Sequence, residues 1–297
     1  MQLWAQDLVN GILAGGILAV VALGFSLVWG IMNIINLAHG AFVMLGAYLT
    51  WELFRQLHVD PFLSLPITFV ALFVLGYLLQ RYVINWVARA PILTTFLLTF
   101  GLSLLIVNIA LIIWTGDTRG VTTSYSGANF TVAGVTVPWA KLLTLVAALA
   151  ITGVLQLWLT RSKMGRAIRA TSMDIGAAQL SGVRVAHIYA IVFGLGAGLA
   201  GVAGTLVSLS YALTPTMGDP FVVAAFVVCV LGGLGSVQGA LVGGLVYGIV
   251  EAFATQLDVT IGTQHISGSG LQDAIALVVL LIVLLVRPTG IIGRATA

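Results

Sequence analysis

Nine hydrophobic segments separated by more polar links dominate this sequence of 297 residues. They are residues 8–31, 36–56, 61–86, 92–114, 139–160, 186–212, 221–235, 237–256 and 271–287. A helix needs about 20 mainly apolar residues to cross the roughly 30 Å hydrocarbon core of a bilayer. Only 221–235 is too short to cross comfortably, so we expect a half-helix or a re-entrant piece there. The pattern predicts an all-α polytopic membrane protein, one domain over residues 1–297, with about eight to ten spanning or half-spanning helices.

The composition supports a membrane protein. Hydrophobic residues make up 60% of the chain and charged residues only 7%, whereas soluble domains carry about 25% charged residues. Glycine is frequent, at 35 residues, which in membranes favours closely packed helices. The single cysteine, Cys229, excludes an internal disulfide. The first residues contain no Lys or Arg, so they do not form the basic start of a cleaved signal peptide.

The cations fall mainly on one side of the predicted membrane. If residues 161–184 lie in the cytoplasm, nine of the 12 Lys and Arg residues lie inside and three lie outside. The inner group is Arg81, Arg89, Arg161, Lys163, Arg166, Arg169, Arg184, Arg287 and Arg294, and the outer group is Arg55, Arg119 and Lys141. The positive-inside rule then predicts an external N-terminus and a cytoplasmic C-terminus. Because topology accounts for the cations, the net charge of +3 does not indicate nucleic-acid binding.

The segment 161–184 is the most polar stretch on the predicted inner side. It carries five cationic side chains and one carboxylate. Thr171 followed by Asp174 resembles a capping box, so we expect a helix over Ser172–Ser181 that stops at Gly182. Two interpretations remain open: a rigid handle for a cytosolic partner, or a basic loop that only fixes topology.

Polar residues also interrupt the hydrophobic segments. Asn33, Asn36 and His39 lie near the link between the first two segments, and Thr95 and Thr99 are four residues apart in the fourth. Unpaired polar groups are costly at membrane depth, so these residues either hydrogen-bond between helices or line a polar path. They are our candidates for the translocation path. For the two threonines, hydrogen bonds to their own helix favour a packing role.

Small residues and a weak repeat suggest how the helices pack. Gly235, Gly239 and Gly243 follow the small-xxx-small spacing of close helix contacts. Residues 39–43 resemble residues 238–242, which indicates an internal repeat typical of transporters. With the topology above, the two copies are parallel.

The long external stretch, residues 115–138, is predicted to contain structure of its own. It is rich in Gly, Ser and Thr, as expected of a loop outside the membrane. Residues 129–137 alternate in polarity and carry a turn at Ala133-Gly134, which predicts a small β-hairpin.

Several chemistries lack their usual residues. Neither lysine follows a glycine, so the chain has no Walker-type nucleotide loop. The four histidines are scattered, and no metal site is predicted. No segment carries a carboxylate at its centre, which disfavours a proton-coupled carrier. We find no nucleophile paired with a base, and we therefore predict no catalytic residue and no cofactor.

Four motifs occur in order along the chain. They are Asn36-Leu37-Ala38-His39-Gly40 with Gly46-Ala47-Tyr48, Met164–Ala170 with Asp174 and Gly182, Leu231–Ala240, and Arg287-Pro288-Thr289-Gly290. Together they resemble the permeases of bacterial branched-chain amino acid ABC importers, specifically the shorter of the two permease types. Importers of urea and short amides share these motifs, so both substrate classes stay open. A proton-coupled carrier and a channel-like protein remain the alternatives from other classes.

The resemblance implies an assembly in the bacterial inner membrane. The expected partners are a second related permease, two cytoplasmic ABC ATPases and a periplasmic substrate-binding protein, and import would proceed by ATP-driven alternating access. Residues 163–183 resemble the coupling helix that docks on an ATPase. The implied docking residues are Gly165, Arg166, Arg169, Asp174, Ala177, Ala178 and Gly182.

Overall fold

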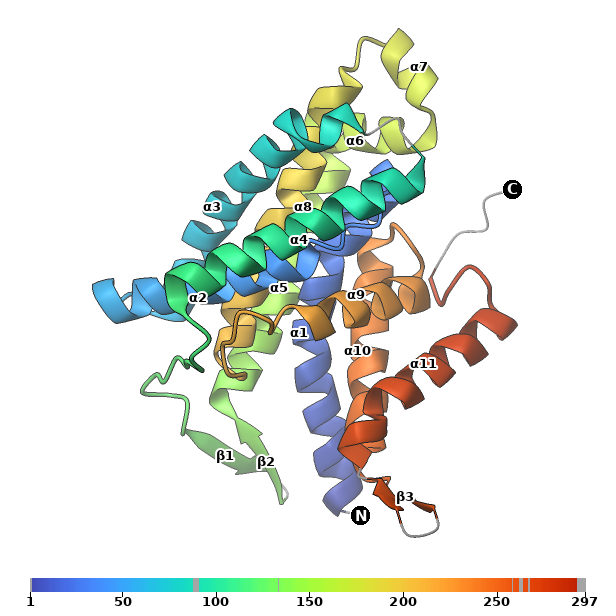
Figure 1. Cartoon of the computed structure of the whole chain (residues 1–297). Helices are drawn as coiled ribbons and strands as arrows, with labels where there is room; N and C mark the ends of the chain where they lie inside the picture. The colour runs from blue at the N-terminus through green and yellow to red at the C-terminus, as the bar shows by residue number, and fades with distance from the viewer. Residues whose placement is uncertain are drawn as a thin grey trace.

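The computed structural model describes residues 2–87, 91–132, 134–257, 259–261, 264–266 and 268–292. Within these ranges the regular secondary structure is helical apart from two short β-hairpins, and loops connect the elements (Figure 1). The predicted all-α membrane fold is therefore confirmed.

The elements follow the predicted hydrophobic segments closely. The helices are α1 (Gln2–Met32), α2 (His39–Leu57), α3 (Pro61–Tyr82), η1 (Ile84–Trp86), α4 (Ile92–Trp114), α5 (Trp139–Arg161), α6 (Lys163–Met173), α7 (Ile175–Leu180), α8 (Val185–Ser208), α9 (Asp219–Gly232), α10 (Val237–Ala254) and α11 (Gly268–Val286). The strands are β1 (Asn129–Val132), β2 (Val135–Pro138), β3 (Val259–Ile261) and β4 (Gln264–Ile266).

Six of the described helices are long and apolar enough to cross a membrane: α1, α3 continued by η1, α4, α5, α8 and α10. Apolar helix α9 has only 14 residues, about 21 Å of helix, which is shorter than the hydrocarbon core. Its end nevertheless reaches the residues that follow α11, because the amides of Ile291 and Ile292 donate to the carbonyls of Leu231 and Gly232.

Helices α1 and α8 form the centre of the molecule, and most of their residues are buried. Helix α1 packs against α10, and α8 packs against α2 and α3. Glycines allow this close approach: a Cβ added at Gly15 would lie 2.7 Å from the carbonyl oxygen of Gly244. In contrast, α3, α4 and α5 expose many aliphatic side chains at the surface, as expected for helices that face lipid.

The glycines singled out in the sequence lie around the α9–α10 hairpin. Gly239 and Gly243 face α9, where an added Cβ would contact the backbone of Gly232. Gly235 lies in the turn before α10, with a φ of +77°, and it packs against Gly30 of α1.

The predicted repeat pairs helices of similar length. An offset of 199 residues moves α2 onto residues 238–256, which nearly coincide with α10 (Val237–Ala254). The same offset moves α3 onto residues 260–281, which overlap α11. The parallel relation of the two copies remains a prediction.

The predicted hairpin in 129–137 is confirmed, with β1 and β2 paired antiparallel and a φ of +83° at Gly134. The side chain of Gln6 binds both the amide and the carbonyl of Thr136, at 2.8 and 2.9 Å. Arg119 forms a backbone bridge with Leu213, in the link between α8 and α9. The N-terminus, the 115–138 loop and the α8–α9 link therefore lie at one end of the molecule, opposite α6 and α7 (Figure 1).

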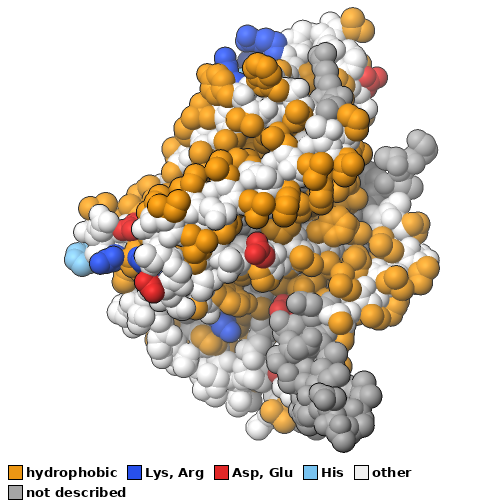
Figure 2. Space-filling view, viewed as in Figure 1, with side chains coloured by type: hydrophobic (Ala, Val, Ile, Leu, Met, Phe, Trp, Pro, Cys, Tyr) orange, Lys and Arg blue, Asp and Glu red, His pale blue; other side chains and the backbone are white. Residues whose placement is uncertain are grey.

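Figure 2 shows this polarity on the surface. Hydrophobic side chains cover the middle of the visible face, and a group of Lys and Arg side chains lies at the end formed by α6 and α7. This arrangement is the one expected when an apolar belt separates two aqueous ends.

Candidate functional site

The polar segment 161–184 folds into two short helices instead of the predicted single helix over Ser172–Ser181, which is wrong. Helix α6 begins earlier, where the hydroxyl of Ser162 accepts a 2.8 Å hydrogen bond from the amide of Gly165. Thr171 lies inside α6 and donates to the carbonyl of Ala167, so it caps nothing. Asp174 adopts an extended conformation and caps α7, its carboxylate accepting from the amide of Ala177 at 3.0 Å. The helix breaks there because Asp competes with the helix for backbone amides.

The predicted stop at Gly182 is confirmed. Gly182 has a φ of +82°, and the amide of Val183 donates to the carbonyl of Ala178 at 3.0 Å. This bond pattern and the left-handed glycine are those of a Schellman ending. Helix α7 is therefore fixed at both ends by local hydrogen bonds.

Three of the predicted docking residues hold the segment to the membrane helices. Gly165 is buried against the backbone of Leu159, and a Cβ there would overlap it. The guanidinium of Arg169 donates to the carbonyls of Leu159 and Thr160, at the end of α5. That of Arg166 reaches the carbonyl of Arg161 at 3.3 Å. These bonds satisfy carbonyls at the end of α5 that lack helical partners.

The other four predicted docking residues belong to α7 and its caps. Ala178 is 3% exposed and packs inside the chain. Asp174, Ala177 and Gly182 are exposed. The structure thus brings all seven predicted residues into one segment, although only some of them lie on its outer surface.

Sequence reasoning missed the large apolar side chains of this outer surface. Met173 is 87% exposed, Leu180 93% and Ile175 45%, at the end of the molecule where the cations gather. We call Met173, Ile175 and Leu180 the apolar tip. The available signal was three large apolar residues in a segment that lies outside the hydrophobic spans.

The second candidate site is the turn between α1 and α2, residues 33–39, which we call the polar turn. Asn33, exposed and with a φ of +53°, ends α1. Asn36 is buried, and its side-chain carbonyl accepts from the amide of Ala38 at 3.1 Å. His39 is fully buried, with its Nε2 2.8 Å from the carbonyl oxygen of Val21. Because Val21 precedes the end of α1 by about 16 Å of helix, the chain folds back into the interior here.

Of the two threonines of α4, Thr99 binds this turn. Thr99 donates to the carbonyl of Ile35 at 3.1 Å and accepts from the amide of Leu37 at 3.3 Å. Thr95 is also buried. The structure thus brings Asn36, His39 and Thr99 together.

Helices α2 and α9 begin next to each other in the interior. Gly40 and Gly218 touch through their backbones, and a Cβ on either would overlap the other. In Figure 1 both helices lie crosswise to α1 and extend to opposite sides of it. Transporter binding sites commonly lie where interrupted helices meet in this way.

A cavity of about 460 Å³ lies beside the start of α9. Its lining includes Leu18, Met217, Phe221, Tyr211, Tyr247 and Glu251. The cavity therefore has an apolar wall and, in addition, two phenol groups and one carboxylate in its lining. The available sequence signal was indirect: the offset of 199 residues that relates the two copies of the repeat pairs Tyr247 with Tyr48 and Glu251 with Glu52.

In the part of the chain that the structure describes, no group of three metal-ligating side chains occurs. The fold, the buried polar turn and the projecting helix pair define a multi-pass membrane transport component. The family described as "Branched-chain amino acid transport system / permease component" matches residues 8–286, and the chain belongs to this family.

The chain is similar to several branched-chain amino acid transport permeases along nearly its full length. It is 32% identical to the high-affinity branched-chain amino acid transport system permease protein BraD of Pseudomonas aeruginosa, covering 98% of this chain and 96% of the relative. It is 31% identical to the corresponding LivH protein of Escherichia coli K12, covering 97% and 95%. It is 30% identical to the probable LivH permease of Methanocaldococcus jannaschii, covering 96% and 91%. No solved structure matches significantly.

Proposed function

We propose that this chain is the membrane-spanning permease of an ABC importer that takes up branched-chain or related hydrophobic amino acids by ATP-driven alternating access. The single observation that carries the proposal is the apolar tip on α6 and α7, at the cation-rich end of a protein of this family. Large apolar side chains exposed to water at the end of a helix pair favour a protein partner.

The docking partner would be a cytoplasmic ATPase, with the apolar tip inserted in a groove on its surface. Motion of the tip would pass to the membrane helices as a rigid body. Two connections support this transmission. Arg169 and the buried Gly165 tie α6 to the end of α5, and the short ending at Gly182 leads directly into α8.

The proposed orientation puts the N-terminus and the 115–138 loop outside, and α6, α7 and the C-terminus in the cytoplasm. The excess of cations at the α6–α7 end supports it. The full assembly would contain a second related permease, two ATPases and an external substrate-binding protein that delivers the amino acid to the 115–138 end.

The path for the substrate would include the 460 Å³ cavity and the polar turn. The apolar wall formed by Leu18, Met217 and Phe221 suits an aliphatic side chain, and Glu251 suits an ammonium group. A urea or short-amide substrate would make no use of this apolar wall, so the lining favours hydrophobic amino acids.

Replacing His39 with Leu tests the inner part of this path. We expect reduced uptake with an intact ATPase complex, because the polar contact to Val21 is lost. Normal uptake by this variant would assign the polar turn to packing alone.

The decisive experiment is reconstitution of the complex in proteoliposomes with radiolabelled leucine and the external binding protein. We expect uptake that requires ATP, persists with an uncoupler and is competed by isoleucine or valine but not by urea. Uptake abolished by the uncoupler in ATP-loaded vesicles would identify a proton-coupled carrier instead. Passive flux without any ATPase would identify a channel.

A further inference from the structure

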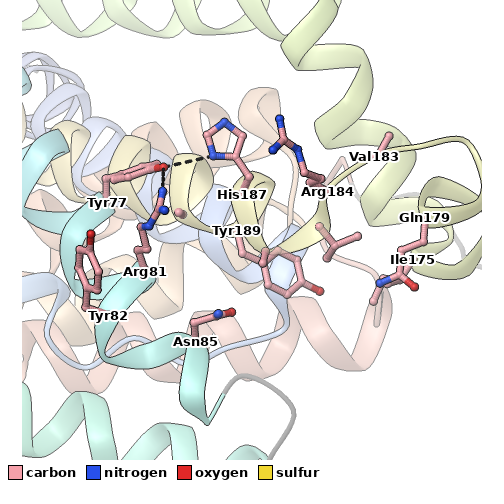
Figure 3. Close-up of a pocket in the computed structure, with 13 residues that line it drawn as sticks. Tyr77, Arg81, Tyr82, Asn85, Ile175, Gln179, Val183, Arg184, His187 and Tyr189 are labelled. Atoms are coloured by element: carbon pink, nitrogen blue, oxygen red, sulfur yellow. Dashed lines mark hydrogen bonds between the residues drawn. The ribbon is translucent and has the colours of Figure 1, made fainter.

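A second and larger cavity, of about 1100 Å³, lies at the cation-rich end. It adjoins residues 161–184, which we call the coupling segment. The end of α3, η1, α7 and the start of α8 form its walls. Its polar lining includes Tyr77, Arg81, Tyr82, Arg184, His187 and Tyr189 (Figure 3). Helix α7 closes one side with Ile175 and Gln179.

The lining is cationic and contains no carboxylate among its described residues. Arg81 donates to the hydroxyl of Tyr77 at 3.2 Å, and that hydroxyl lies 3.2 Å from Nδ1 of His187. The guanidinium of Arg184, labelled in Figure 3, makes no hydrogen bond or ion pair within the described ranges, although the backbone carbonyl of Arg184 accepts from the amides of His187 and Ile188. Two guanidinium groups without an acidic partner favour an anion with several oxygen acceptors, such as a phosphate.

The position of the cavity relative to the bilayer favours a phospholipid over a soluble anion as the ligand. Val74 and Leu78, on α3 just before Arg81, are exposed, as expected of side chains that face the acyl chains of a bilayer. Tyr82 and Trp86 follow Arg81 and are 64% and 87% exposed. Aromatic side chains gather at the membrane–water interface, so Arg81 lies at the depth of the lipid headgroups.

We propose that this cavity binds the headgroup of an anionic phospholipid from the cytoplasmic leaflet. Arg81 and Arg184 would contact its phosphate, and its acyl chains would lie along Val74 and Leu78. Basic pockets between membrane helices are suited to such headgroups. A bound headgroup would also brace α7 against α3 and α8, so the coupling segment would be held by a lipid as well as by protein. The leaflet assignment rests on the proposed orientation of the importer, but lipid binding does not require transport activity.

The test measures lipid bound to the purified chain by native mass spectrometry, with phosphatidylglycerol and phosphatidylcholine as probes. We expect retention of phosphatidylglycerol by the natural chain and about tenfold weaker binding by the double variant Arg81→Gln/Arg184→Gln. The matched control is Arg161→Gln/Arg287→Gln, which removes the same charge from two exposed arginines that do not line the cavity. The control should bind phosphatidylglycerol normally.

A third variant guards against a change of topology or folding. Arg81→Lys/Arg184→Lys keeps both charges but loses the planar guanidinium fork, and it should bind more lipid than the Gln pair.

If the Gln pair and the control lose phosphatidylglycerol binding equally, the lipid responds only to general surface charge, and the proposed binding site is wrong. Full displacement of the lipid by equimolar inorganic phosphate would assign the cavity to a soluble anion. Unchanged lipid binding in the Gln pair, with loss of a co-purifying ATPase, would assign it to the protein interface. Since the lipid measurement uses the chain alone, failure of transport would leave its result unaffected.

Discussion

Replacing Leu180 with Asp should separate the permease from its ATPase without unfolding it. Leu180 is 93% exposed in the isolated chain, and the ATPase groove would remove most of that surface from water. Full burial of a Leu side chain is worth about 1.5–3 kcal/mol, and a carboxylate in an apolar groove adds a desolvation cost. A loss of about 2–3 kcal/mol weakens docking by about 30- to 150-fold.

The assay measures the affinity of the purified ATPase for the permease in lipid nanodiscs, together with ATP hydrolysis and uptake in proteoliposomes. The matched control is Ser181→Asp, which adds the same charge at the neighbouring exposed position. Both variants should keep their thermal stability within about 0.5 kcal/mol, because neither residue is part of the core. A Leu180→Asp variant that binds the ATPase as tightly as the natural chain would refute the docking role of the apolar tip.

Leu180 is a sharper probe than Ala178. Because Ala178 is buried within the chain, a bulky residue there would displace α7 from its own protein. Weak docking by such a variant would then report local misfolding.

Three further predictions concern orientation, coupling and the external loop. On a Cys229→Ala background, a cysteine at exposed Ser124 should react with an impermeant reagent in intact cells, whereas one at Ser172 should react only after permeabilisation. Arg169→Met should lower uptake per ATP hydrolysed in proteoliposomes, because about 1 kcal/mol of contact between α6 and α5 is lost. Burial, and then the hydrogen bond to a carboxylate, raises the pKa of Tyr125 to about 12; its phenolate absorbance, isolated by comparison with Tyr125→Phe, should appear only near that pH.

Each of these predictions has an internal control. External labelling at Ser172 would reverse the proposed orientation. Arg169→Lys keeps a donor and should restore much of the coupling, and equal uncoupling by the Lys variant would show that packing, not hydrogen bonding, holds α6. Since the folded pKa of Tyr125 lies above its ordinary value of 10, its contribution to stability is present below pH 10 and is lost as the pH rises toward 12. Ionisation of Tyr125 near pH 10 in the folded protein would contradict the buried contact with Asp60.

The helical fold was predictable because the bilayer acts on each segment separately. A run of apolar residues must satisfy its backbone hydrogen bonds internally, so hydropathy alone locates the helices to within a few residues. The hairpin at Gly134 and the stop at Gly182 were predictable for a similar reason, since a left-handed backbone favours glycine whatever surrounds it.

The site depended on contacts between distant parts of the chain, which no local pattern encodes. Within residues 161–184, sequence reasoning favoured one helix and its charges. The structure instead broke the helix at Asp174, used Arg169 to hold α5, buried Ala178 and exposed Leu180. Whether a side chain on a short helix is inside or outside depends on which neighbour covers it, and here the neighbours are the ends of α5 and α8.

The same holds for the polar turn and the cavity lined by Arg81 and Arg184. His39 reaches the carbonyl of Val21 only because the chain folds back along α1. Arg81 and Arg184 line the same cavity only because α3 packs along α8. The sequence by itself determined that this chain crosses the membrane many times and where its cations lie. The tertiary structure decided which polar groups meet, because that depends on glycine contacts between helices far apart in the sequence.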